Sequence, residues 1–140
     1  MSSEQQKALV LRFWKAFEAD DQAALNDLLA ADFVARTPGA PEPQSREWHL
    51  QGIRGFNSAF SNRDFTVEEM VVDDDVVATR TVMRGVHTGE WQGHAPTGKS
   101  IEATGLTIER VRDGKLVERW FSFDVARVMQ ELGLVTPQAN

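Results

Sequence analysis

The sequence of 140 residues contains no cysteine and no tyrosine. The absence of cysteine excludes disulfide bonds, thiolate nucleophiles and every zinc site that uses sulfur ligands, and it leaves the redox compartment undecided. The aromatic residues are four tryptophans and eight phenylalanines, which supply a large apolar surface. Because tyrosine is absent, none of the aromatic side chains carries a hydroxyl donor. These aromatic residues therefore predict apolar packing and apolar contacts with a ligand.

Long apolar runs and clustered basic residues are also missing. No stretch approaches the roughly 20 apolar residues that are needed to cross a bilayer. Glu4, Lys7, Arg12 and Lys15 interrupt the region where a signal peptide would be apolar. The net charge is −6, and the 15 lysines and arginines are scattered instead of forming a basic stripe. We therefore expect a cytoplasmic protein with neither a nucleic acid nor a membrane as its partner.

The length of the chain fits one domain that buries its core without metal or disulfide support. Apolar residues make up 41% and charged residues 26% of the sequence, which is ordinary for a globular protein. No repeat, low-complexity segment or long linker divides the sequence. Residues 1–140 are therefore expected to form a single domain.

Helical spacing characterises the N-terminal part of the sequence. Leu9, Phe13 and Phe17 recur at intervals of four residues, which predicts a helix with one apolar face. Ser3 and Gln6 have the residue types and spacing of a capping box. This pair predicts that the first helix begins close to Ser3.

A second, shorter helix and a strand come next. Asp21 is suited to cap a helix whose apolar edge lies within residues 25–29. Residues 33–36 predict a short strand, which the sequence Thr37-Pro38-Gly39 ends. Two further prolines keep the following stretch irregular.

The hydrophobic period changes from about 3.6 residues to 2 after a third helical segment. That segment has its apolar stripe at Ile53, Phe56 and Phe60, between Gly52 and Asn62. The rest of the sequence is mostly strand, in four segments: residues 65–72, 76–87, 101–111 and 116–123.

Turn residues separate these four strands. The run Asp73-Asp74-Asp75 joins the first two, Pro96-Thr97-Gly98 precedes the third, and Asp113-Gly114 is a favoured pair for a type I′ hairpin. A last helix over residues 125–132 ends at Gly133. Helices followed by an antiparallel meander predict an α+β fold with the helices on one face of the sheet.

A strongly curved antiparallel sheet with helices packed on its concave face forms a cone around a pocket. Side chains fill the narrow end of such a cone, while its mouth stays open. The open end is where an apolar small molecule would bind.

Three motifs in the C-terminal half carry a family resemblance. They are residues 85–93 (GVHTGEWQG), residues 96–99 (PTGK) and residues 110–118 (RVRDGKLVE), with Trp120 and Asp124 after them. This pattern resembles the SnoaL-like polyketide cyclases, many of which are labelled ester cyclases, within the nuclear-transport-factor-2-like superfamily. The resemblance implies a cone-shaped fold, a homodimer formed through the outer face of the sheet, and no metal or organic cofactor.

The family pattern also implies an acidic residue that acts as general acid and base in an intramolecular aldol closure. In the cyclases this acid directly follows the tryptophan of the last strand, and here that position is Phe121. Thr107, which cannot act as a base near neutral pH, occupies an inward polar position of the preceding strand. Ala35 and Arg36 stand where many relatives have a histidine or an aspartate. The cyclase mechanism therefore does not transfer directly to this chain.

Two other residues are candidates for acid/base catalysis. Asp124 ends the last strand, where a desolvated carboxyl could face the pocket, although an aspartate directly before a helix is also a good N-cap. His87 could transfer protons at physiological pH, or its ring could orient the turn through Gly89 by a hydrogen bond. The spacing of His49, His87 and His94 fits no metal-ligand pair, so no metal site is expected.

Candidate ligand-binding residues come from strands and loops. Arg36 could hold a carboxylate, enolate or phosphate, or form a salt bridge of little energetic value. Strand alternation puts Arg119 on the same face as Phe121, and the family pattern implies that this face is the inner one. Tryptophans in or near loops could line the mouth, although core or dimer packing is the commoner role. The full predicted binding set is Arg36, Trp48, His49, Trp91, Thr107, Arg119 and Phe121.

The leading functional hypothesis is a cofactor-independent enzyme that cyclises or isomerises an apolar, carbonyl-bearing, polyketide-like substrate by proton transfer. Asp124 and His87 would exchange the protons, and Arg36 and Arg119 would stabilise developing negative charge. Two alternatives stay open. A non-catalytic small-molecule-binding module fits the neutral residues at positions 107 and 121. A hydrolase of the epoxide-opening type would need a carboxylate that activates water.

Overall fold

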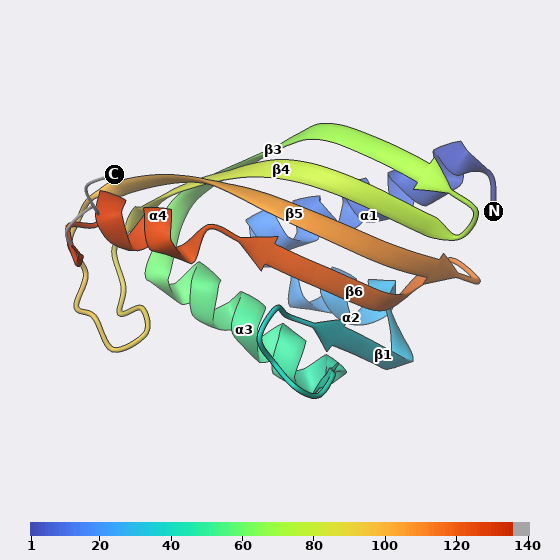
Figure 1. Cartoon of the computed structure of the whole chain (residues 1–140), viewed down its shortest axis with the longest axis horizontal. Helices are drawn as coiled ribbons and strands as arrows, with labels where there is room; N and C mark the ends of the chain where they lie inside the picture. Colours follow the sequence, from blue (N-terminus) through green and yellow to red (C-terminus); the bar gives the residue numbers. More distant parts are fainter. Residues whose placement is uncertain (136–140) are drawn as a thin grey trace.

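Six strands form one curved sheet in the computed structural model of the chain, which describes residues 1–135 (Figure 1). Their order across the sheet is β2-β1-β6-β5-β4-β3. The strands are β1 (Leu29–Arg36), β2 (Gln44–Ser45), β3 (Phe60–Asp73), β4 (Val76–His87), β5 (Ser100–Arg112) and β6 (Lys115–Phe123). The helices are α1 (Ser3–Ala19), α2 (Gln22–Leu28), α3 (Arg46–Ala59) and α4 (Val125–Glu131). The α+β fold class and the curved sheet of the prediction are confirmed.

The antiparallel meander is formed by β3, β4, β5 and β6, as the period-2 pattern predicts. Strand β4 has the predicted bounds, and β5 and β6 extend the predictions by one residue at some ends. The Asp113-Gly114 turn has positive φ at both residues, +53° and +76°, as a type I′ turn requires. The local pattern was sufficient here because each strand buries one face and exposes the other.

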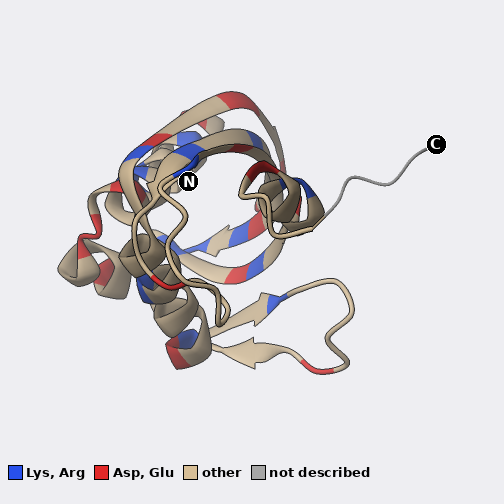
Figure 2. Cartoon of the chain, turned by 90° about the vertical axis from the view of Figure 1, so that its left-hand side faces the viewer, with Lys and Arg blue, Asp and Glu red and all other residues tan. Residues whose placement is uncertain are grey.

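Strand β1 departs from the predicted all-antiparallel sheet. It is longer than the predicted residues 33–36, and it runs parallel to β6, with Val34 opposite Glu118 and Ala35 opposite Arg119. Its other edge pairs with the two-residue strand β2, which the prediction missed. The loop that joins β1 to β2 projects away from the rest of the chain (Figure 2).

Helix α3 begins earlier and ends earlier than predicted. The side chain of Ser45 caps it by accepting a hydrogen bond from the backbone N–H of Trp48 at 3.1 Å. The helix ends at Ala59, and Phe60 belongs to β3, where it lies opposite His87. The periodicity of residues 53–60 therefore merged the end of a helix with the start of a strand.

Helix α1 carries the capping box one residue earlier than predicted. Ser2 accepts from the backbone N–H of Gln5 at 3.1 Å, and the Gln5 side chain accepts from the Ser2 backbone N–H at 2.8 Å. Gln6 instead donates to the carbonyl oxygen of Asp74 at 2.7 Å, which ties α1 to the β3–β4 turn.

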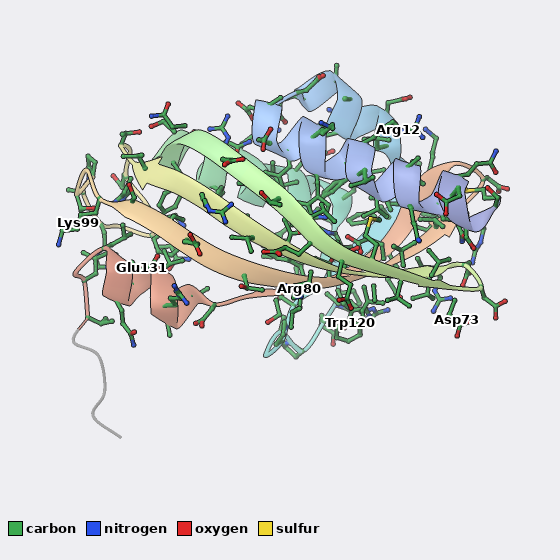
Figure 3. All side chains as sticks on the ribbon, turned by 90° about the horizontal axis from the view of Figure 1, so that it is seen from above. Arg12, Asp73, Arg80, Lys99, Trp120 and Glu131 are labelled. Carbon is green, nitrogen blue, oxygen red and sulfur yellow. The ribbon has the colours of Figure 1, made fainter. Side chains whose placement is uncertain are left out.

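The core lies between α1 and the concave face of the sheet (Figures 1 and 3). Phe13 and Leu9 of α1 are fully buried, and they belong to one apolar cluster with Leu116 of β6. No helix within residues 1–135 is both long and apolar enough to span a bilayer. Basic and acidic residues are interspersed over the strands and helices (Figure 2).

The segment between β4 and β5 is fastened to α3 and to the end of β4. The backbone N–H groups of Thr88 and Gly89 both donate to the carbonyl oxygen of Ala59, at 2.9 and 3.0 Å. Trp91 is buried against Phe60, with ring centroids 5.4 Å apart. A Cβ atom at Gly89 would lie far inside van der Waals contact with the carbonyl oxygen of Ser58, so only glycine allows this close approach.

We predict that Gly89→Ala destabilises the fold by about 1–3 kcal/mol, because the added methyl group forces α3 and the 88–99 segment apart. Denaturant unfolding followed by circular dichroism measures the change. Ser58→Ala keeps the carbonyl oxygen and serves as the control, with a free energy of unfolding close to that of the wild type. Wild-type stability of the Gly89 variant would contradict the packing described above.

Candidate active site

A cavity of about 610 Å³ lies along α3, between this helix and the inner face of the sheet. Its volume is within the range of about 300–1,000 Å³ that small-molecule sites occupy. Its wall is mostly aromatic or aliphatic: Phe17, Trp48, Ile53, Phe56, Met83, Trp91, Phe121, Phe123 and Val125. Three of the residues that line it are ionisable: His49, Glu90 and Arg119. The cavity is therefore apolar with a few polar groups, and not wholly apolar.

His49 and Arg119 meet at the buried end of the cavity. The guanidinium Nη1 of Arg119 donates to Nε2 of His49 at 3.0 Å, and both residues are buried. Because a guanidinium has no acceptor, Nε2 must carry a lone pair and Nδ1 must carry the proton. Burial, and then the positive charge of Arg119, lower the pKa of His49 to about 3. The imidazole is therefore neutral near pH 7, with Nδ1–H as a hydrogen-bond donor.

Arg119 has an exposed fraction of 0%, so water cannot solvate its charge. Its Nε donates to Oε1 of Glu109 at 3.2 Å. The guanidinium carbon also lies over three aromatic rings, 4.3 Å from the centroid of Phe13 and 4.9 Å from those of Trp14 and Phe121. The cation–π contacts and the carboxylate together replace hydration. Its Nη2 has no partner among the described residues.

Glu109 is a functional residue that the sequence analysis missed. It is fully buried, and burial raises the pKa of its carboxyl, while the charge of Arg119 and the nearby Thr107 hydroxyl act in the opposite direction. Alternation along residues 101–111 places Glu109 on the same face as Thr107, and a glutamate on a buried face was the signal that could have found it. The carboxylate of Glu109 therefore balances the positive charge of Arg119, which lies next to His49.

Five of the predicted ligand-binding residues line the cavity. They come from α3, from β6 and from the segment after β4: Trp48, His49, Trp91, Arg119 and Phe121. Trp48 is 47% exposed at the mouth, whereas Trp91 is largely buried. The alternation along β6 is confirmed, with Arg119 buried on the inner face and Trp120 exposed on the outer one.

Arg36 and Thr107 do not line the cavity, so their assignment to the binding set stays a prediction that the cavity does not support. Arg36 donates from Nε to Glu118 at 3.0 Å and lies over the ring of Trp120, 5.6 Å from its centroid. The salt-bridge alternative therefore describes this arginine. Thr107 is buried on β5, directly opposite Phe121, where it lies beside Glu109.

Asp124 and His87, the predicted acid/base pair, do not line the cavity either. Asp124 caps α4 by accepting from the backbone N–H of Arg127 at 3.0 Å. His87 is fully buried, and its Nδ1 accepts from the backbone N–H of Thr97 at 3.1 Å. The imidazole thus orients the 88–99 segment through Thr97 and not through Gly89. Catalytic roles for these two residues remain predictions to which the cavity gives no support.

Glu90 is an ionisable residue of the cavity that the sequence analysis also did not single out. It lies at the mouth, between the fastened Gly89 and the buried Trp91, and its carboxylate has no hydrogen bond or ion pair within residues 1–135. In the same part of the chain, no three histidine or acidic side chains are placed to hold a metal ion.

The depressed pKa of His49 predicts a specific loss of stability at acidic pH. In the unfolded chain His49 has its usual pKa near 6.5, whereas in the folded chain its pKa is about 3. Between these two pH values the unfolded chain binds a proton on His49 that the folded chain does not bind. The contribution of His49 is therefore fully present above pH 6.5 and decreases as the pH falls. When the pH is lowered from 7 to 5, the free energy of unfolding should fall by about 2 kcal/mol more in the wild type than in His49→Gln, whose glutamine cannot titrate. Denaturant unfolding at both pH values measures this difference, and equal losses would contradict the burial of a neutral imidazole.

Comparisons with known proteins agree with the fold. The family model described as SnoaL-like polyketide cyclase matches residues 8–132. IdmH from Streptomyces antibioticus, a proposed polyketide cyclase, is 34% identical and covers 92% of this chain and 99% of its own, with a TM-score of 0.83. AclR from Streptomyces galilaeus, a proposed hydroxylase, is 25% identical and covers 99% of this chain and 87% of its own, with a TM-score of 0.90.

TsrD from Streptomyces laurentii shares the fold at 21% identity, with a TM-score of 0.84 over 96% of this chain and 99% of its own. No curated protein matches the sequence. The family model covers most of the chain, and the nuclear-transport-factor-2-like fold accounts for both the curved sheet and the cavity beneath it. The chain belongs to the SnoaL-like polyketide cyclase family.

Proposed function

We propose that the protein catalyses the acid/base cyclisation or isomerisation of an apolar, carbonyl-bearing, polyketide-like molecule without a cofactor. The observation that carries this proposal is the neutral His49 at the buried end of an apolar cavity, with the charge of Arg119 directly behind it. A neutral imidazole that donates a hydrogen bond can stabilise negative charge on a carbonyl oxygen.

In the proposed reaction the substrate carbonyl accepts a hydrogen bond from Nδ1–H of His49. A base removes the proton from the neighbouring carbon, and the electron pair of the broken C–H bond moves onto the oxygen as an enolate. The Arg119 charge lies behind the imidazole and favours the enolate over the ketone. Isomerisation follows when the proton returns to another carbon. Cyclisation follows when the enolate carbon attacks a second carbonyl carbon of the same molecule: the π electron pair of that C=O moves onto its oxygen, which takes up the proton that the base removed.

Glu90 is the proposed base. With phenylalanine at position 121, the carboxylate must come from elsewhere, and Glu90 is the acidic residue among those that line the cavity. Glu90 is exposed and its carboxylate forms no ion pair or hydrogen bond within residues 1–135, so both oxygens are available for a proton. The proposed cyclase assignment of IdmH supports the same type of reaction. The ionisable groups of the cavity favour an enzyme over a purely binding module.

The test uses 2-tetralone, an apolar bicyclic ketone, in heavy water. We expect the wild type to accelerate exchange of the hydrogens next to the carbonyl for deuterium, as measured by NMR. His49→Ala and Glu90→Gln should each slow the catalysed exchange by about 100-fold, the range in which single acid/base or oxyanion-stabilising groups act.

Glu47→Gln is the matched control, because Glu47 is an exposed carboxylate on α3 that does not line the cavity. It should exchange at the wild-type rate. Binding of 2-tetralone without any exchange would favour the binding-module alternative. Exchange that survives both substitutions would overturn the assigned roles, and epoxide opening by the wild type would favour the hydrolase alternative.

We also propose that two copies of the chain associate through the outer face of the sheet. Four apolar side chains on this face are between 46% and 57% exposed: Val71, Leu106, Ile108 and Trp120. They line a groove of about 450 Å³, together with Arg80 and Glu69. Arg80 and Trp120 lie on the side of the sheet away from α1 (Figure 3). Soluble proteins commonly bury an exposed apolar patch of this kind against the same patch of a second copy of the chain.

Sedimentation velocity tests the dimer. The wild type should sediment with twice the chain mass of 15.7 kDa, and Ile108→Lys, which puts a charge into the apolar groove, should sediment as a monomer. Leu11→Lys is the control, since Leu11 is exposed on α1 and should leave the dimer intact. A monomeric wild type at tens of micromolar would overturn the proposal.

A further inference from the structure

Helix α3 presents two glycines to the cavity. Trp48, Gly52 and Gly55 follow one another at intervals of four and three residues, so they share one face of the helix. All three line the cavity. His49 and Ile53 precede Phe56 at the same spacing, one residue further round, and form the neighbouring, buried stripe. The two glycines therefore leave a section of bare backbone that follows Trp48 along α3.

The protein itself gives no reason for glycine at these two positions. A Cβ atom built at Gly52 or Gly55 meets no other atom within 4 Å, in contrast to Gly89, where it would collide with backbone. Neither residue has a positive φ. Glycine inside a helix is disfavoured relative to alanine, because it loses more backbone freedom on folding. The space that the missing methyl groups leave is part of the cavity, which suggests that its occupant uses it.

A second observation points to a ligand at the same place. Nδ1 of His49 makes no hydrogen bond to the described residues, although His49 lines the cavity and is only 6% exposed. A hydrogen-bond donor without a protein partner in a largely buried position implies a partner that the protein does not supply. A molecule with an acceptor oxygen at this end would complete it.

Two aromatic rings of β6 line the opposite wall of the cavity. The rings of Phe121 and Phe123 are stacked, with centroids 5.7 Å apart and an angle of 23° between their planes. Both rings line the same cavity as the two glycines. The distance along α3 from Trp48 to Gly55 is about 10 Å at 1.5 Å per residue, the length of a small fused-ring system.

We infer that Gly52 and Gly55 form a ledge for the flat, fused-ring part of the substrate, whose oxygen points to His49 and Arg119. The ring system lies directly on the backbone of α3, which a side chain at either position would prevent. The two glycines thus select flat ring systems of two or more fused rings. This inference rests on the proposed function only in that the cavity binds an apolar molecule with an acceptor oxygen.

The experiment compares Gly52→Ala and Gly55→Ala with the wild type in two measurements that should move in opposite directions. The Tm of each variant should rise by about 2–5 °C, because alanine favours the helix. The affinity for 2-naphthol, a flat bicyclic probe followed by its fluorescence, should fall about tenfold, because the methyl group occupies the ledge. The affinity for phenol, a single ring measured by calorimetry, should change less than twofold.

Gln51→Ala is the matched control, since Gln51 is exposed on the same helix and does not line the cavity. It should leave both affinities unchanged. A higher Tm with unchanged affinity for 2-naphthol overturns the ledge, as does an equal loss for phenol and 2-naphthol. A lower Tm shows that the fold itself requires glycine and also overturns it.

The ledge and the proposed function fail in distinguishable ways. If the wild type binds neither probe, the shared premise of an apolar ligand site is wrong. If the glycine variants discriminate between the probes but the wild type exchanges no hydrogen of 2-tetralone, the ledge stands and the proposed reaction is wrong. If 2-tetralone exchange depends on His49 while the glycine variants bind both probes normally, the reaction stands and the ledge is wrong.

Discussion

The buried guanidinium of Arg119 is the constraint on which the rest of the structure depends. An unhydrated charge inside a protein costs several kcal/mol, and it is tolerated only when partners surround it. Here the partners are Glu109 on the neighbouring strand, His49 on α3, and aromatic rings from α1 and β6. Loss of Glu109 would leave an uncompensated buried charge, at a cost of about 3–5 kcal/mol. The side chain of Arg119 on β6 therefore connects this strand to β5, α1 and α3.

The same constraint connects the fold to its chemistry. Burial, together with the Arg119 charge that Glu109 balances, keeps the imidazole of His49 neutral, and the hydrogen bond from Arg119 fixes which nitrogen carries the proton. The aromatic and aliphatic wall excludes water, and this strengthens the electrostatic effect of the few polar groups that remain. A stabilising element of the core thus becomes the polar end of a binding cavity.

Much of the architecture could be predicted from local patterns. The period of 2 located β4, β5 and β6, and their alternation placed Arg119 and Phe121 inward and Trp120 outward. Trp48 and Trp91 were predicted to line the mouth as residues in or near loops; both line the cavity, but Trp48 lies on α3 and Trp91 is largely buried. The acid/base candidates were less predictable. An aspartate before a helix has the same local sequence whether it caps the helix or faces a ligand, and only the hydrogen bond of Asp124 to Arg127 distinguishes the two.

The sequence by itself determined the fold class, the family and the polarity of each strand face, because these depend on residue types at short spacing. The tertiary structure alone decided which charges meet. A regular hairpin from the Asp113-Gly114 turn would place Glu109 opposite Glu118, but the register shifts between Val111 and Arg110, so that Arg119 lies opposite Glu109 instead. The meeting of Arg119 with His49 adds a contact across 70 residues of chain. Neither is encoded in local periodicity, since both depend on how separate elements pack together.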